Sequence, residues 1–175
     1  PIALRFVPPQ CKIRYGRIPY QVPARTDLSD RLDNVLHVIY LVFNEGYSAS
    51  SGGALTRQDL SGEAIRLGRL LVELLGEPEA SGLLALMLLQ ESRRAARTSE
   101  DGELVLLADQ DRARGDRALI AEGAGRLEQA LASRRIGPYT LPAAIAAAHA
   151  PAATAHAPGW AAVRGTVGRN EGSRA

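Results

Sequence analysis

The stretch PEASGLLALMLLQESRRAAR, residues 78–97, determines how the rest of the chain can fold. Its middle part, LLALMLLQ, carries apolar side chains on all sides of a helix rather than along one stripe. A helix of this kind is stable in water only when other elements cover it all round. We therefore predict a central helix over residues 78–97, with only its charged end, from Glu91 to Arg97, reaching solvent.

Two further helices are predicted before the central one. From residue 29 to about residue 44, apolar side chains recur at three- and four-residue steps and form one broad face. These residues are Leu32, Val35, Leu36, Ile39, Tyr40 and Phe43. Gly46 suits the left-handed residue that often ends a helix. The next helix opens at Thr56 and Asp59, which resemble a capping box, and a tight connection follows at Gly76.

The segment after the central helix is more varied. ELVLLADQDR, residues 103–112, contains a short apolar run that fits either a strand or a buried extended piece. A fourth helix is predicted over about 112–133, and a fifth begins near Thr140 with Pro142 in its first turn, where proline is tolerated. Helices joined by short connections predict an all-α fold, in which antiparallel helix pairs form a layered array.

The two ends of the chain differ from this pattern. Residues 1–27 hold five prolines among scattered bases, and no helix can continue through that spacing. We predict an extended linker or arm there, the helical domain over residues 28–160, and a flexible tail over residues 161–175.

Composition argues against several classes of protein. The formal net charge is +2, and the concentrated basic face of a domain that holds DNA unaided is missing. Cys11 is alone, which excludes a disulfide framework and a cysteine metal cluster and favours a reducing compartment such as the cytoplasm. No apolar run reaches the roughly 18 residues that span a bilayer. We predict no membrane contact, metal or cofactor.

One candidate interaction surface is FNEGYSASSG, residues 43–52. It gathers hydrogen-bonding groups and one aromatic ring at the end of an apolar helix: Asn44, Glu45, Tyr47 and Ser48. The simpler interpretation is an ordinary helix end at Gly46, and spacing alone favours it. Both interpretations stay open at this point.

A second candidate surface is DGELVLLADQDRARGDR, residues 101–117, which contains Asp109, Asp111 and Arg112. A calcium loop needs oxygen ligands at alternating positions, and arginines stand there instead. An ion-pair cluster, or a helix N-terminus capped by Asp111, is favoured. The arginines of QESRRAAR, residues 90–97, could touch nucleic acid or an acidic partner, but such arginines more often satisfy helix C-terminal carbonyls.

Seven blocks of the sequence occur in an order and spacing that resemble a known family. They are IPYQVP, VIYLVFNEGYSASSG, LSGEAIRLGRLL, LLALMLLQESRRAAR, DGELVLLADQDR, DRALIAEG and GPYTLPAAIAAAHA. Together, over about residues 17–150, they resemble the C-terminal extension of a group of bacterial extracytoplasmic-function RNA polymerase sigma factors, an extension described as tetratricopeptide-like.

The resemblance implies a regulatory and interaction domain that contributes to transcription initiation and is not an enzyme. It implies RNA polymerase core or the protein's own sigma domains as partners, with promoter DNA contacted only by the full-length protein. The two DNA-reading domains that precede the extension in that family are not visible here. The chain also departs from the family at Gly115, where a large aromatic is expected, and at VPPQC, residues 7–11, which interrupts a basic helix.

Two other functions fit the residues. A stand-alone helical scaffold could bind a peptide or small ligand on its concave side, using exposed Tyr47 and Tyr139. An enzyme could use Glu45 with His37 or Asp109 as acid and base, which requires a buried carboxyl with a raised pKa. The chain contains no nucleophile elbow, P-loop or dinucleotide fingerprint, so we expect no enzymatic activity.

Overall fold

The computed structural model of the chain describes residues 28–48, 58–99 and 103–150. The predictions for the N-terminal arm, for Thr56 and for the tail after residue 160 lie outside these ranges. Contacts between Cα atoms divide the chain into two units, residues 1–34 and 35–175, and the packing described below is that within the second unit.

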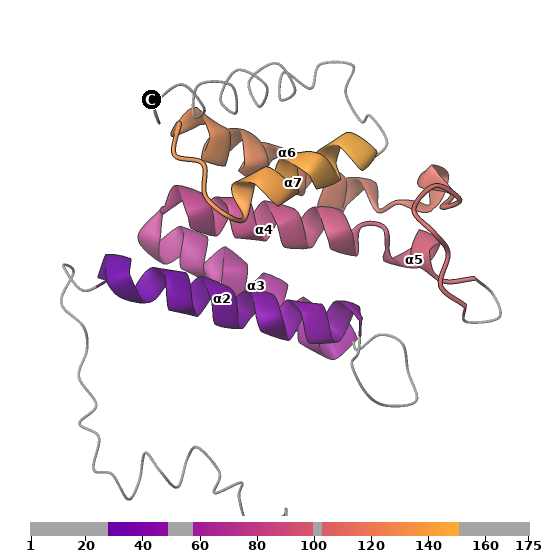
Figure 1. The fold of residues 1–175 in the computed structure, drawn as a ribbon, viewed down its shortest axis with the longest axis horizontal. Coiled ribbons are helices and arrows are strands. Elements are labelled where there is room, and N and C mark those ends of the chain that lie inside the picture. The colour runs from indigo at the N-terminus through magenta and orange to yellow at the C-terminus, as the bar shows by residue number, and fades with distance from the viewer. Residues whose placement is uncertain (1–27, 49–57, 100–102, 151–175) are drawn as a thin grey trace, which may run out of the picture. The chain divides into compact units, whose positions relative to one another are not determined.

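Every regular element in the described ranges is a helix, which confirms the predicted all-α fold (Figure 1). The helices are α2 (Leu28–Tyr47), α3 (Gln58–Leu75), α4 (Pro78–Glu91), α5 (Arg94–Arg97), the 3-10 helix η2 (Arg112–Arg114), α6 (Arg117–Ala132) and α7 (Thr140–His149). In the described ranges the only β pairing is an isolated bridge between Thr98 and Leu104. None of the described helices is both long enough and apolar enough to cross a membrane.

Helix α4 is the buried centre of the second unit, as its apolar sequence predicts. Every residue from Ala80 to Leu89 is buried, because α4 packs against α3, α6 and α7 (Figure 1). The helices approach closely where α4 or its neighbour has no side chain. A Cβ atom at Gly123 of α6 would lie 2.9 Å from Leu89 Cγ, and one at Gly82 of α4 would collide with Thr140 Oγ1.

The central helix ends at Glu91 rather than continuing to Arg97 as predicted. In an unbroken helix the Ser92 carbonyl would accept a hydrogen bond from the Ala96 amide. Here that carbonyl accepts from the amide of Asp116 (2.8 Å), and the Ala96 amide donates to Arg93 instead (3.0 Å). Contact with the start of α6 therefore separates α4 from the short helix α5.

Helix α6 begins at Arg117, five residues later than predicted. The Asp116 carboxylate caps it by accepting hydrogen bonds from the amides of Ala118 (2.9 Å) and Leu119 (3.1 Å). One face of α6 is buried, with Ile120, Gly123, Leu127 and Ala130 in the core. The predicted start of α7 at Thr140 is confirmed.

The apolar run at residues 103–112 forms neither a strand nor a buried extended piece, so both expectations for it are wrong. Leu104, Leu106 and Leu107 are exposed, at 51%, 70% and 43% of their surface. Turns at residues 107–109 and the 3-10 helix η2 follow the run. Because the leucines are exposed, the apolar pattern of this short window did not indicate which side chains are buried.

Candidate functional site

The end of α2, the first predicted interaction surface, is built differently from a glycine-capped helix. The helix continues through Gly46 to Tyr47, and the Ser48 amide still donates to the Asn44 carbonyl (2.8 Å). Among the described glycines, Gly76 at the end of α3 is the one with a positive φ (+64°). The prediction that Gly46 ends the helix in a left-handed conformation is therefore wrong.

Two arginines of α5 take the place of the glycine cap. Arg94 Nη2 donates to the Gly46 carbonyl (3.4 Å), and Arg97 Nη1 donates to the Tyr47 carbonyl (2.5 Å). The guanidinium of Arg97 also lies 3.8 Å from the centroid of the Tyr47 ring, in cation–π geometry. Cations at a helix C-terminus neutralise its partial negative charge. The arginines thus satisfy helix-terminal carbonyls, as predicted, but those of a helix about fifty residues earlier.

Arg94 of α5 forms hydrogen bonds to three other elements, α2, α3 and α4. Besides the contact with α2, its guanidinium makes two hydrogen bonds to the Glu91 carboxylate (2.6 and 2.8 Å) and one to Ser61 Oγ of α3 (2.7 Å). The side chains of Arg94 and Glu91 are only 18% and 10% exposed. Removing one partner of such a largely buried ion pair is costly, because the remaining charge loses its partner.

Aromatic packing orients the ring that Arg97 covers. Phe43 is fully buried, and its ring stacks on Tyr47 with centroids 5.6 Å apart and planes 16° apart. We call the resulting surface the α2–α5 junction: Asn44, Glu45, Tyr47, Ser48, Arg94 and Arg97. Ser48 is exposed, and the other five residues are partly exposed.

The second predicted surface lies on the connection between α5 and α6. Asp109, Asp111 and Arg112 are all exposed, and within the described residues none of the three forms an ion pair with the α2–α5 junction. Within the described part of the chain, no ion pair joins its acids and arginines, so the ion-pair interpretation is wrong. The capping interpretation is right, because the Asp111 carboxylate accepts from the Ala113 amide (2.9 Å) at the start of η2.

Glu79 forms a junction that the sequence did not indicate. Its carboxylate accepts hydrogen bonds from the amides of Gly137 (3.0 Å), Tyr139 (2.5 Å) and Thr140 (3.2 Å), and from Thr140 Oγ1 (2.8 Å). A first-turn acid of α4 thereby caps the N-terminus of α7, about sixty residues away. Tyr139 also packs edge-on against Tyr40 of α2, with centroids 5.5 Å apart. Like Tyr47, Tyr139 is partly exposed, so neither ring has the full exposure that the scaffold alternative expected.

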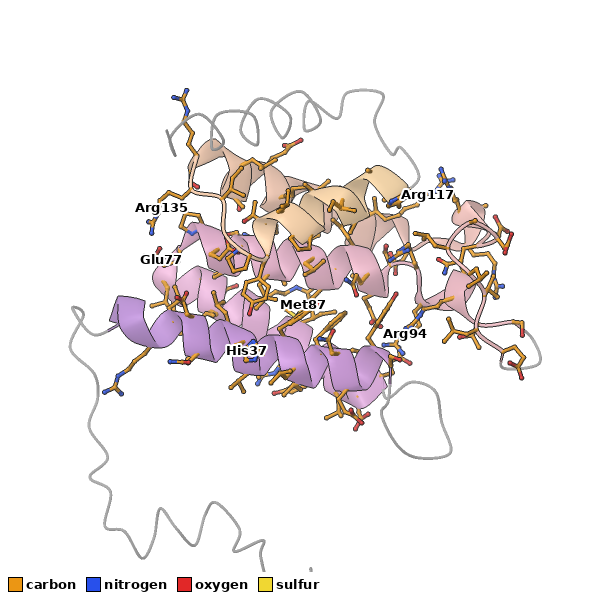
Figure 2. The ribbon with its side chains drawn as sticks, in the orientation of Figure 1. His37, Glu77, Met87, Arg94, Arg117 and Arg135 are labelled. Carbon is orange, nitrogen blue, oxygen red and sulfur yellow. The ribbon has the colours of Figure 1, made fainter. Side chains whose placement is uncertain are left out.

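The acid and base groups weighed for an enzyme are not drawn together. His37 is exposed on α2 (Figure 2), and Glu45 follows it by eight residues, which separates the two by about 12 Å along the axis. Asp109 lies on the exposed connection before α6. In the ranges that the structure describes, no cluster of three or more His, Cys, Asp or Glu side chains could hold a metal ion.

Comparison with known proteins identifies the family of the chain. Residues 31–131, which include the α2–α5 junction and both predicted surfaces, match a family of unknown function, DUF6596. The chain belongs to the DUF6596 family.

A relative of this DUF6596 chain is the uncharacterized protein R00370 of Rhizobium meliloti (strain 1021), which is 45% identical over 157 residues. The match covers 89% of this chain but 37% of the relative, so the chain spans little more than a third of that protein. No solved structure matches the chain.

Proposed function

We propose that this DUF6596 chain is the C-terminal regulatory and interaction domain of an extracytoplasmic-function RNA polymerase sigma factor. In this proposal it acts in the bacterial cytoplasm, contacts polymerase core or the protein's own sigma domains, and leaves promoter recognition to domains outside the chain. The pairs α3–α4 and α6–α7, each made of contacting helices with a short connection, are compatible with the tetratricopeptide-like units that the proposal requires.

The α2–α5 junction is the observation that carries the proposal. It unites two of the blocks that resemble the sigma-factor extension, VIYLVFNEGYSASSG and LLALMLLQESRRAAR. Arg94 and Arg97 of the second block donate to the carbonyls of Gly46 and Tyr47, at the end of the helix in the first block. A helix end whose last carbonyls are bound by two partly exposed arginines presents its polar groups in one geometry, which favours recognition of another macromolecule over a loose surface turn.

The comparison with the longer relative is compatible with this function. More than half of the Rhizobium meliloti protein lies outside the matched region, which leaves room for additional domains. The DUF6596 family has no known function, so the match does not indicate an activity. The proposed sigma-factor function therefore depends on the seven sequence blocks and on the junction that two of them form.

Reconstituted transcription tests the proposal. The full-length protein that contains this chain is combined with RNA polymerase core and genomic DNA fragments, and initiated transcripts are mapped. We expect promoter-specific initiation that changes when residues 28–175 are deleted, or when Ser48→Arg places a large charge on the junction. Ala148→Arg, on an exposed position of α7, is the matched control and should have no effect.

Two results would overturn the proposal. One is a full-length protein that directs no promoter-specific initiation with core polymerase. The other is a deletion variant that initiates at the same promoters with the same yield as the intact protein.

A further inference from the structure

The break between α4 and α5 (Figure 1) occurs in a stretch whose sequence favours a continuous helix. ESRRAAR, residues 91–97, contains neither glycine nor proline, and glutamate, arginine and alanine are strong helix formers. Ser92 keeps helical dihedral angles (φ −55°, ψ −25°), whereas those of Arg93 are not helical (φ −95°, ψ 2°). Arg93 differs from a helical residue by about 30° in φ and about 45° in ψ. A modest rotation at Arg93 would therefore join α4 and α5 into one helix.

Contacts with two other elements hold α5 in this bent position. At the start of α6, the Asp116 amide donates to the Ser92 carbonyl (2.8 Å), the group that the Ala96 amide would bind in a continuous helix. At the end of α2, the last two carbonyls of that helix accept hydrogen bonds from the two arginines of α5. The position of α5 therefore depends on both contacts.

The bent position leaves two hydrogen-bonding groups at the break without partners. Arg93 Nε and Arg94 Nη1 are buried, and neither has a hydrogen-bond partner among the described residues. A buried donor that makes no hydrogen bond is unfavourable. Rotation at Arg93 changes the position of both side chains, so a second position of α5 can relieve this penalty.

We propose that Arg93 is a hinge with two positions, through which the start of α6 controls the α2–α5 junction. In the second position the Ser92 carbonyl releases the Asp116 amide and accepts from the Ala96 amide. Helices α4 and α5 then form one helix, and the two arginines leave the end of α2. The connection between α5 and α6 can span about 60 Å and so follows this movement. This inference goes beyond the proposed function and does not depend on it, because it concerns contacts within the chain.

Two substitutions at Asp116 isolate its hydrogen bond to Ser92. Asp116 has a φ of −71°, and Gly115 before it is extended (φ −67°, ψ 139°), so both positions accept a proline at residue 116. Asp116→Pro replaces the N–H with a ring carbon at the place of the hydrogen bond. Asp116→Ala is the matched control, because both variants lose the capping carboxylate whereas alanine keeps the amide.

Nuclear magnetic resonance of the 175-residue chain measures the effect at both ends of α5. In the bent position the Arg97 guanidinium lies 3.8 Å from the centroid of the Tyr47 ring, so the ring current shifts its proton resonances upfield. Asp116→Pro should remove most of this upfield shift and move the Cα resonance of Arg93 to its helical value. Asp116→Ala should change neither resonance. Tyr47→Leu supplies the reference for Arg97 protons without the ring.

A second variant tests the coupling from the other end and leaves α6 unchanged. Coupling between two sites is reciprocal and typically amounts to about 5- to 150-fold. Arg97→Leu, which removes a contact with α2, should therefore accelerate hydrogen exchange of the Asp116 amide by about tenfold. Arg66→Met, at a side chain of α3 that is 61% exposed, is the control and should leave this exchange rate unchanged.

Three results would overturn the hinge. One is an Asp116→Pro variant that keeps its helices, as shown by circular dichroism, and also keeps the upfield shift of Arg97. Another is an Arg93 Cα resonance that moves to its random-coil value, which would mean that α5 unfolds rather than joins α4. The third decides the matter if Asp116→Pro does not fold: an unchanged exchange rate of the Asp116 amide in Arg97→Leu. None of these results affects the proposed function, which the transcription assay tests separately.

Discussion

At the scale of single residues, two glycines of α6 show what the sequence alone leaves undetermined. Gly123 and Gly125 both occur in the segment AEGAGR and look alike in any pattern. In the fold, a Cβ atom at Gly123 would lie 2.9 Å from Leu89 Cγ and 3.3 Å from Leu88 Cβ, whereas one at Gly125 would meet nothing within 4 Å. Only the packing of α6 on α4 gives the two positions different roles.

Alanine substitutions at the two glycines should change the free energy of unfolding in opposite directions. Gly123→Ala should lower the free energy of unfolding by about 1 kcal/mol, because the overpacking cost of about 1–3 kcal/mol exceeds the gain in helix propensity. Gly125→Ala should raise it by about 0.5–1 kcal/mol through propensity alone. Urea unfolding followed by circular dichroism measures both, and a change of the same sign in the two variants would contradict the packing argument.

The buried pair of Arg94 and Glu91 should be the most sensitive charged contact of the candidate site. Arg94→Met should lower the free energy of unfolding by about 3 kcal/mol, because it leaves a carboxylate without its buried partner. The double variant Glu91→Gln/Arg94→Met should lose less than the sum of its single changes, as determined in a urea double-mutant cycle.

A matched pair in α3 controls for sequence spacing. Arg66 and Glu63 have the same three-residue separation, but their side chains are 61% and 48% exposed. Arg66→Met should therefore have a far smaller effect than Arg94→Met. Equal losses would mean that burial does not determine the strength of the Arg94–Glu91 contact.

At the scale of elements, apolar periodicity predicted where the helices lie, and long-range hydrogen bonds determine where they end. The buried faces of α4 and α6 follow the predicted pattern. The ends of α2 and α4 do not, because their terminal groups bind Arg94, Arg97 and Asp116, which are distant in sequence. The capping of α7 by Glu79 is hidden from the sequence for the same reason.

The residues of the candidate site also fall into a group that the sequence predicts and a group that it does not. The polar residues at the end of α2 were predictable because they interrupt an apolar pattern. Their arginine partners were recognised only as a generic basic helix end, since spacing cannot show which carbonyls a side chain will reach. The exposed leucines could not be predicted, because four residues are too few to distinguish a buried run from a displayed one.

An ion pair between α3 and α6 should make stability depend on pH. Arg69 Nη2 lies 2.7 Å from Glu122 Oε2, with the side chains 42% and 31% exposed. The hydrogen bond from Arg69 lowers the pKa of Glu122 below its ordinary 4.5. A carboxyl whose folded pKa is depressed stabilises the fold above its unfolded pKa, and this contribution is lost as pH falls through the folded pKa.

Glu122→Gln should therefore lower the free energy of unfolding at neutral pH by only about 0.5 kcal/mol, since partly exposed pairs are screened. The difference from the unmodified chain should shrink as the pH falls below 4.5 and the Glu122 carboxyl becomes protonated. Urea midpoints measured across this range for both chains give the comparison. A difference that stays constant with pH would show that packing of the side chain, rather than its charge, links the two helices.

At the scale of the whole molecule, the packing of α4 against α3, α6 and α7 predicts that these four helices unfold as one cooperative unit. Helix α4 contacts α3 along one part of its surface and α6 and α7 along others, and its residues from Ala80 to Leu89 have almost no exposed surface. The α2–α5 junction is attached to this core through Glu91 at the end of α4. Separating α4 from one neighbour would therefore expose apolar surface that the remaining helices cannot cover.

Native-state hydrogen exchange and one core substitution test this coupling. The amides of α4 should exchange only by global unfolding, with a free energy equal to that from urea unfolding, while amides of the connection at residues 103–111 exchange through local openings. Leu88→Ala should lower the stability of all the packed helices together by about 2–5 kcal/mol, because Leu88 is fully buried. Leu74→Ala, at a position 71% exposed, is the control and should have little effect. If Leu88→Ala released α6 and α7 while α3 and α4 kept their protection, α4 would join two independent layers rather than one cooperative core.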